Sequence, residues 1–251
     1  MARRTIVPST AGRLPLLLAA MALSTGLAAC GSDDEGSSSS TTEPATTATT
    51  DTTASTGSDV NADTGCKEVS APKPRTGEPD LPEPRPARLS GTWTVTFVTS
   101  CGSFSFRLDT ARQPKTAASV ASLVRARFYD GLTFHRISPA PPIIQGGDPT
   151  GDGSGGPGYS VEETPPKDAA YTRGIVAMAK TGQEPAGTSG SQFFVVTGED
   201  AQLPPDYAIA GKVTKGIDVA ERINGLGTAD PSGDGAPVQT VVIEKATLKR
   251  G

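Results

Sequence analysis

The sequence predicts a mainly β domain, closed as a barrel of short strands and accompanied by two helices. Two apolar stretches early in the domain alternate with polar residues, which is the periodicity of strands that bury one face. Further short apolar runs follow over residues 143–210, separated by glycine- and proline-rich loops. Helical periodicity is confined to one early and one late segment, and many short strands with few helices favour a barrel.

The first two predicted strands form a hairpin. Between residues 93 and 108, apolar side chains alternate with threonine, serine and arginine on either side of a turn at residues 99–102, a typical hairpin pattern. The apolar positions are Trp93, Val95, Phe97, Phe104, Phe106 and Leu108. Each strand therefore offers one apolar face to a core.

Two helices are predicted, one before and one after the central strands in the sequence. Pro114 suits the first position of a helix, where its missing N–H costs no hydrogen bond. Apolar residues then recur at helical spacing as far as Phe128, which predicts a helix of about fourteen residues lying on the sheet. A shorter helix is predicted over residues 217–223, and a last strand over about residues 238–248.

The N-terminal residues 1–30 have the composition of a targeting segment. Arginines precede an apolar stretch over residues 14–27 that is too short for a comfortable membrane-spanning helix;. The stretch ends in Leu27-Ala28-Ala29-Cys30, which resembles the bacterial lipobox, in which the cysteine is lipidated. We expect Cys30 to carry a lipid such as palmitate. The alternative is a plain secretory signal peptide that contains a cysteine.

Residues 31–87 are expected to form a tether between this signal peptide and the domain at residues 88–251. Residues 31–64 contain mostly Ser, Thr, Asp, Ala and Gly, with Val60 as the single large aliphatic residue. Such a segment buries too little apolar surface to offset its ordering entropy, so we expect it to be disordered. Residues 71–87 are dense in proline, which favours an extended, semi-rigid spacer.

The two remaining cysteines, Cys66 and Cys101, are expected to form a disulfide. The lipoprotein interpretation places the chain outside the cytoplasm, where disulfides persist, and lipidation of Cys30 leaves no other thiol. The bridge would join the end of the tether to the first hairpin. Two unpaired thiols remain the alternative, because spacing alone does not establish geometry.

Composition and charge argue against several classes of function. The net charge is −4 and no basic stripe is present, so no nucleic-acid partner is expected;. The sequence holds one histidine, so no metal site is expected;. The presence of a single histidine also argues against a β-barrel hydrolase. The glycine-rich string around Ser154 matches neither a serine-protease layout nor a dinucleotide site, because Pro157 prevents a helix from starting there.

Three segments resemble the cyclophilin family of peptidyl-prolyl cis-trans isomerases. They are Phe134-His135-Arg136, Gln145-Gly146-Gly147-Asp148 and Gly190-Ser191-Gln192-Phe193-Phe194, and they occur in the family's order and at near-family spacing. The resemblance covers about residues 90–248. It implies a closed antiparallel eight-stranded barrel capped by two helices, with rotamase activity on X-Pro bonds and no cofactor.

The resemblance also implies roles for individual residues. Arg136 would donate a hydrogen bond to the prolyl nitrogen as the amide twists, and Gln145 would orient the substrate backbone and the arginine. Arginine suits this role, because its guanidinium group is always charged and presents several N–H donors. These donors bind the twisted amide better than either planar isomer. The substrate-binding positions would be Ile143, Ala179, Gln192, Phe194, Leu203 and Tyr207.

Departures from the family pattern leave a second function open. Pro142 or its neighbour stands where the family generally has a pocket phenylalanine, Lys180 replaces a frequent asparagine, and Gln202 replaces a frequent tryptophan. The altered pocket favours a catalytically weak module that binds proline peptides, whereas the retained Arg136 favours an isomerase. In either case we expect a monomer that binds proline-containing polypeptides and is lipid-anchored on the extracytoplasmic face of the cell membrane.

Overall fold

The computed structural model describes residues 61, 63–76 and 81–251. All of them belong to one compact unit, residues 54–251. The predicted signal peptide, Cys30 and most of the expected tether lie outside the described residues. Within the described part, no helix has the length and apolar composition needed to cross a membrane.

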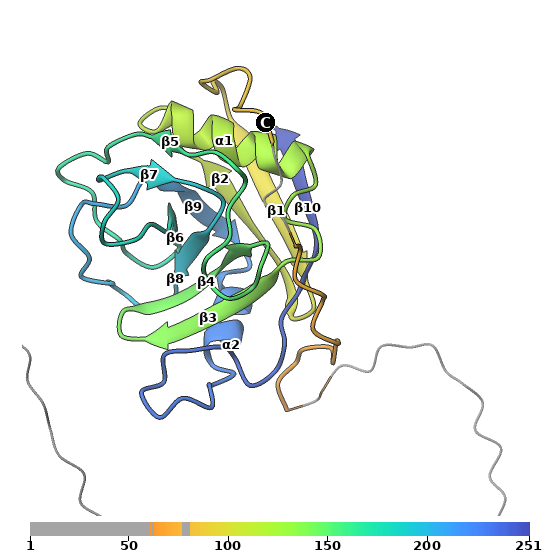
Figure 1. Ribbon diagram of the computed structural model, residues 1–251. Coiled ribbons are helices and arrows are strands. Elements are labelled where there is room, and N and C mark those ends of the chain that lie inside the picture. The colour runs from red at the N-terminus through yellow and green to blue at the C-terminus, as the bar shows by residue number, and fades with distance from the viewer. Residues whose placement is uncertain (1–60, 62, 77–80) are drawn as a thin grey trace, which may run out of the picture. The chain divides into compact units, whose positions relative to one another are not determined.

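Ten strands and two helices follow one another along the domain (Figure 1). In chain order they are β1 (Trp93–Thr99), β2 (Gly102–Leu108), α1 (Pro114–Arg125), β3 (Thr133–Pro139), β4 (Pro142–Asp148), β5 (Val161–Glu162), β6 (Ile175–Met178), β7 (Thr188–Ser189), β8 (Phe193–Val196), β9 (Ile209–Lys215), α2 (Ile217–Asn224) and β10 (Ile243–Arg250).

Eight of these strands form one curled sheet in the order β10-β1-β2-β9-β6-β8-β4-β3, and every neighbouring pair is antiparallel. The segment just before β10 also lies beside β3: Phe134 N–H donates to the Val241 carbonyl at 3.0 Å, and Thr133 bridges Val242. The two helices lie at opposite ends of the curled sheet (Figure 1). The predicted mainly β fold, with an eight-stranded antiparallel sheet and two helices, is confirmed.

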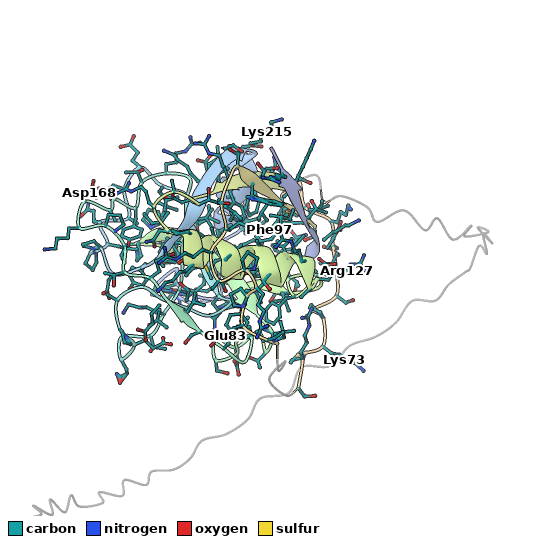
Figure 2. All side chains as sticks on the ribbon, turned by 90° about the horizontal axis from the view of Figure 1, so that it is seen from above. Lys73, Glu83, Phe97, Arg127, Asp168 and Lys215 are labelled. Carbon is teal, nitrogen blue, oxygen red and sulfur yellow. A yellow bond between two sulfur atoms is a disulfide. The ribbon has the colours of Figure 1, made fainter. Side chains whose placement is uncertain are left out.

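The inner face of the sheet carries an aromatic core. Phe97 is fully buried, and its ring centroid lies 5.2 Å from that of Phe193 and 5.4 Å from that of Tyr129. Phe97 therefore lies inside the domain, whereas Asp168 and Lys215 project from its periphery (Figure 2). These aromatic contacts fix the sheet whose outer face forms the candidate site.

Helix α1 begins at Pro114, as predicted, and ends at Arg125. It runs for 12 residues, so it is slightly shorter than expected. The first backbone N–H groups of a helix have no partner within the helix. Here the Glu163 carboxylate accepts two of them, from Lys115 at 3.1 Å and from Thr116 at 2.8 Å.

Helix α2 requires a glycine at its start. Gly216 has a φ of 75°, and a Cβ there would lie 2.3 Å from the Ser103 carbonyl oxygen. Only a residue without a side chain fits both conditions. The tight junction places α2 against β2, β3 and β4.

The last strand begins later than the sequence predicts, at Ile243 instead of about Val238. Val238 is 66% exposed, and the Gln239 side chain bonds the backbone carbonyl of Lys67 at 3.3 Å. The apolar pattern of residues 238–242 thus reflects a loop that packs against the N-terminal segment. The alternation alone could not show this, because it is shared by strands and by extended loops.

The N-terminal segment lies along the domain well before the expected start at residue 88. Cys66 and Cys101 form a disulfide, with an S–S distance of 2.09 Å, and Lys67 N–H donates to the Ser100 carbonyl at 2.8 Å. Farther along, the Arg75 guanidinium donates to the carbonyl oxygens of Phe128, at 2.7 Å, and Asp130. Contacts with the domain therefore extend back at least to Thr64, whose hydroxyl donates to Gln239 Oε1 at 2.8 Å.

Candidate active site

The candidate site lies on the outer face of strands β3, β4, β8 and β6. Strand register sets Arg136 opposite Gln145, Gln145 opposite Phe194 and Phe194 opposite Ala177. Because side chains alternate along a strand, Ile144 enters the aromatic core, whereas Ile143 belongs to a second cluster on the other side;. One sheet face thus brings together polar and apolar residues that are far apart in the sequence.

The apolar half of the site contains five of the six predicted substrate-binding residues. Ile143 and Phe194 are each 3% exposed and form its floor, together with Ala177 and Val196. Partly buried residues pack on this floor, namely Ala179, Leu203 and Tyr207. The partly buried residues therefore form the accessible part of an apolar cluster, and apolar side chains are the usual lining of a site for a small apolar ring such as that of proline;.

Pro142 is the first residue of β4 and is partly buried. It pairs with Pro139 at the turn between β3 and β4, and its carbonyl accepts the Thr197 N–H at 2.9 Å. The aliphatic side chain of Ile143 instead occupies the floor next to Phe194. Position 142 therefore supplies no aromatic side chain to the site, whereas the resemblance implies a phenylalanine there.

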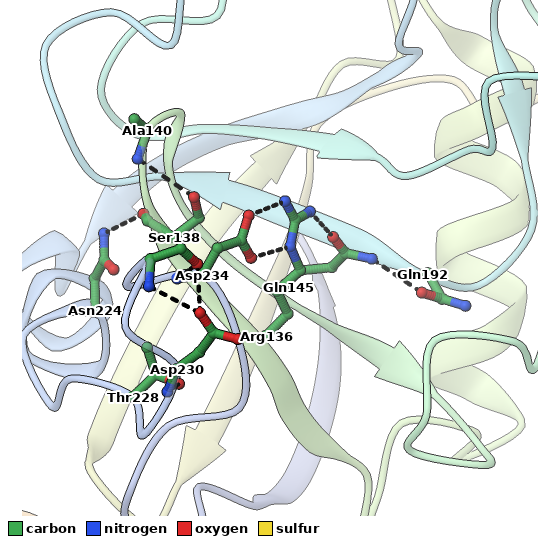
Figure 3. Close-up of polar contacts among 10 residues, drawn as sticks. Arg136, Ser138, Ala140, Gln145, Gln192, Asn224, Thr228, Asp230 and Asp234 are labelled. Carbon is green, nitrogen blue, oxygen red and sulfur yellow. Dashed lines mark hydrogen bonds and ion pairs between the residues drawn. The ribbon is translucent and has the colours of Figure 1, made fainter. Parts of the chain in front are cut away.

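The polar half is a row of hydrogen bonds that starts at Arg136 (Figure 3). Arg136 Nη1 donates to Gln145 Oε1 at 3.0 Å, and Gln145 Nε2 donates to Gln192 Oε1 at 3.0 Å. Gln192 Nε2 in turn donates to the carbonyl oxygens of Gly153, at 2.8 Å, and Gly155, at 2.9 Å. The predicted residues Arg136, Gln145 and Gln192 thus form one connected network.

The sequence analysis did not identify Asp234, which pairs with Arg136. Asp234 Oδ1 accepts from Arg136 Nε at 2.6 Å, and Oδ2 accepts from Nη2 at 2.7 Å (Figure 3). This hydrogen-bonded carboxylate raises the pKa of Arg136, and the same bond lowers the pKa of Asp234. The two residues are 98 positions apart, and no local pattern in the sequence links them.

A groove of about 660 Å³ adjoins the polar row. It is lined by Gln145, Ala179, Lys180, Gln192 and the glycine-rich residues 153–158, among others. The groove therefore connects Gln145 and Gln192 with Ala179, another of the substrate-binding positions that the resemblance implies. An extended peptide could lie along it beside the apolar floor.

Lys180 lines the groove, and its ammonium group is engaged within the protein. Its side chain is 4% exposed, and its ammonium group pairs with Asp206 at 2.7 Å. The ammonium also donates to the carbonyl oxygens of Thr181 and Glu184, each at 3.2 Å, and lies 5.5 Å from the Tyr207 ring centroid. The lysine thus supports the rim residue Tyr207.

His135 is packed beside Arg136 without a hydrogen-bond partner. Both of its ring nitrogens are buried, and neither has a partner among the described residues. Burial lowers the pKa of His135 from its ordinary value of 6.5, so the ring is neutral at pH 7.

We therefore expect the free energy of unfolding to fall as the pH drops from 7.5 to 5. A histidine with a lowered folded-state pKa binds fewer protons when folded, so its stability contribution is complete above about pH 6.5 and declines toward the lowered value. The decline is at most about 1.4 kcal/mol per pH unit. Urea unfolding at both pH values measures it.

The control for this prediction is His135→Gln. The sequence holds no other histidine, so this variant should lose most of the pH dependence. An equal dependence in both proteins would show that other groups cause the decline.

The fold and the site define a β-sheet protein with an apolar peptide pocket beside a fixed arginine. Residues 94–248 match the model of the family described as cyclophilin type peptidyl-prolyl cis-trans isomerase/CLD. The chain belongs to this cyclophilin-type isomerase family. Within the described residues, no group of three or more His, Cys, Asp or Glu side chains is arranged to hold a metal ion.

Curated relatives come from several organisms. The chain is 35% identical over 190 residues to the probable peptidyl-prolyl cis-trans isomerase B of Mycobacterium tuberculosis, a match that covers 70% of this chain and 58% of that protein. It is 39% identical over 120 residues to peptidyl-prolyl cis-trans isomerase B of Bacillus subtilis, covering 47% of this chain and 81% of the relative. The chain thus spans less than two thirds of the mycobacterial relative.

Solved structures of the family agree with the fold. A cyclophilin-type isomerase of Cryptosporidium parvum superposes with a TM-score of 0.57 at 29% identity, covering 64% of this chain and 99% of the other. The same protein in the presence of the dipeptide Ala-Pro gives a TM-score of 0.56 at 30% identity, covering 63% of this chain and 99% of that one.

Proposed function

We propose that this protein catalyses cis/trans isomerisation of X-Pro bonds in exported polypeptides at the cell surface. The observation that carries the proposal is the position of Arg136, held by Gln145 on the sheet face that also carries the apolar floor of Ile143 and Phe194. The names of the curated relatives support the same reaction, and so does the structure of a relative in the presence of the dipeptide Ala-Pro.

The chemistry needs no nucleophile. The barrier of about 18–20 kcal/mol arises from resonance of the peptide bond. As the bond twists, the prolyl nitrogen regains its lone pair and becomes a better hydrogen-bond acceptor. A donor fixed near that nitrogen therefore binds the twisted state more tightly than either planar isomer.

Arg136 retains donors for this task. A guanidinium group carries five N–H bonds. Asp234 and Gln145 accept three of them, which leaves one proton on Nη1 and one on Nη2. The apolar floor would hold the proline ring while the remaining donors reach its nitrogen, and Gln145 and Gln192 would bind the peptide backbone.

The proposed location rests on the N-terminal residues and on the disulfide. The Leu27–Cys30 motif supports lipidation at Cys30 and anchoring on the extracytoplasmic face of the membrane. The Cys66–Cys101 bridge supports an oxidising compartment;. Replacing Cys30 with alanine is expected to move the protein from the membrane fraction to the soluble fraction. Unchanged membrane retention would contradict lipidation at this residue.

A second candidate is a binding module that holds proline peptides without accelerating isomerisation. The observation that favours it is the presence of Pro142, a residue without an aromatic ring, directly before Ile143 at the start of β4, so position 142 supplies no aromatic side chain to the site. Refolding of a disulfide-free protein whose slow phase is prolyl isomerisation distinguishes the two. An isomerase shortens that phase at substoichiometric concentration, and a binding module leaves it unchanged.

A further inference from the structure

We infer that Asp234 is a positioning residue for the isomerase site, which fixes the guanidinium of Arg136 in the orientation that leaves two donors for the substrate. The inference rests on the proposed function and adds to it the residue that prepares the arginine.

The guanidinium is held from two directions. The Asp234 carboxylate accepts two hydrogen bonds, from Nε and Nη2, in a bidentate pair, a geometry that specifies orientation as well as distance. Gln145 accepts the third hydrogen bond, from Nη1. A planar group held through all three of its nitrogens cannot rotate without breaking at least one contact.

The contribution of Asp234 is orientation and not bulk stability. The Arg136 and Asp234 side chains are 37% and 35% exposed, so water screens their attraction and the pair adds little to folding. A free arginine side chain, in contrast, samples many rotamers. Fixing that freedom before the substrate arrives removes a cost from the catalysed step.

The loop that carries Asp234 is braced to present it. Gly235 and Ile137 exchange two backbone hydrogen bonds, at 2.8 and 3.0 Å, so the loop is attached to β3 one residue after Arg136. The Asp230 carboxylate accepts from the backbone N–H of Ser232 at 2.8 Å and from its hydroxyl at 2.6 Å (Figure 3 shows Asp230 and Asp234 in this loop). The loop therefore does not depend on Arg136 for its conformation.

The charge state of the pair is constant across the neutral range. The bond to Arg136 lowers the pKa of Asp234 below its ordinary value, so the carboxylate stays ionised wherever the protein is used near pH 7. An asparagine of the same shape would keep one acceptor but lose the second oxygen and the charge. Asp234→Asn thus distinguishes partial loss of the bidentate pair from its complete loss in Asp234→Ala.

Steady-state kinetics on an X-Pro peptide provide the first test in the full chain. Asp234→Ala is expected to lower kcat by about tenfold, with KM changed by less than about twofold, and Asp234→Asn should fall between it and the wild type. In an Arg136→Ala background, Asp234→Ala should change kcat by less than about twofold, because a residue that acts through the arginine has nothing left to position.

A matched control is Asp168→Asn. Asp168 pairs with Arg112 at 2.9 Å in another exposed aspartate–arginine pair, and neither residue belongs to the site. This variant should leave kcat unchanged. An unaltered kcat in Asp234→Ala would overturn the inference, and so would an equal loss in the presence and absence of Arg136.

A second measurement needs no catalysis, so it separates this inference from the proposed function. Hydrogen exchange of the Arg136 Nε proton, followed by ¹⁵N NMR, should be at least about tenfold faster in Asp234→Ala than in the wild type, because the proton loses its acceptor. Equal exchange would refute the positioning role even in an active protein. If exchange is faster in Asp234→Ala but the wild type does not isomerise peptides, the positioning role of Asp234 is supported and the proposed activity is refuted.

Discussion

Replacing Arg136 with alanine is expected to lower kcat/KM for an X-Pro peptide by about 100-fold. The variant removes the donors that would stabilise the prolyl nitrogen in the twisted state, and loss of one comparable fixed donor in other enzymes costs at least this much. Most of the loss should appear in kcat, because the apolar floor of Ile143 and Phe194 still binds the proline ring;.

Two further variants make this prediction sharper. Arg136→Lys keeps the positive charge but replaces a planar fork with a single ammonium, so it cannot repeat the paired bonds to Asp234 and the bond to Gln145;. We expect it to remain nearly as slow as the alanine variant. Phe194→Ala should instead raise KM, because it removes the floor of the proline pocket. If Arg136→Ala kept more than half of the wild-type kcat/KM, the assigned role of the arginine would be wrong.

Removal of the Cys66–Cys101 disulfide is expected to cost about 4 kcal/mol of unfolding free energy in the chain-entropy model. The bridge spans a sequence separation of 35 residues, and both sulfur-bearing residues are buried. Paired Cys66→Ala and Cys101→Ala substitutions, measured by guanidinium unfolding, test this value. Treating the wild type with a reductant should produce a similar loss.

The same double variant should keep its kcat/KM under conditions where it is folded. Cys101 lies in the turn between β1 and β2, which supplies no residue to the site. A loss of less than about 1 kcal/mol would mean that the N-terminal segment is held mainly by its hydrogen bonds. A loss of activity in the folded variant would show that this segment also supports the site.

Much of the fold could be predicted because its signals are local. The alternation around Phe97 and Phe104 defines a hairpin within 16 residues, β1 to β2, and Pro114 marks the start of α1. In these segments the periodicity and the turn residues agree with the final packing. Val238 shows the limit of this approach, because its apolar neighbours reflect packing of a loop against the N-terminal segment.

Site residues could be predicted only where they lie within a recognisable sequence motif. Arg136, Gln145 and Gln192 lie in segments with recognisable order and spacing, and the structure joins them in one network. Asp234 comes from a distant loop, and an aspartate among glycines and prolines in a loop has no distinguishing sequence pattern;. Lys180 departs from the family pattern in the sequence, but only the structure shows that its ammonium group pairs with Asp206.

The wild-type protein is expected to catalyse isomerisation, and exchange spectroscopy tests this most directly. Uncatalysed X-Pro bonds interconvert in tens to hundreds of seconds, so an Ala-Pro peptide alone gives no exchange cross-peaks between its cis and trans proline signals. A small fraction of protein should produce these cross-peaks, and Arg136→Ala should weaken them severely. Shifted peptide signals without cross-peaks, meaning binding without isomerisation, would contradict the account and favour the binding module.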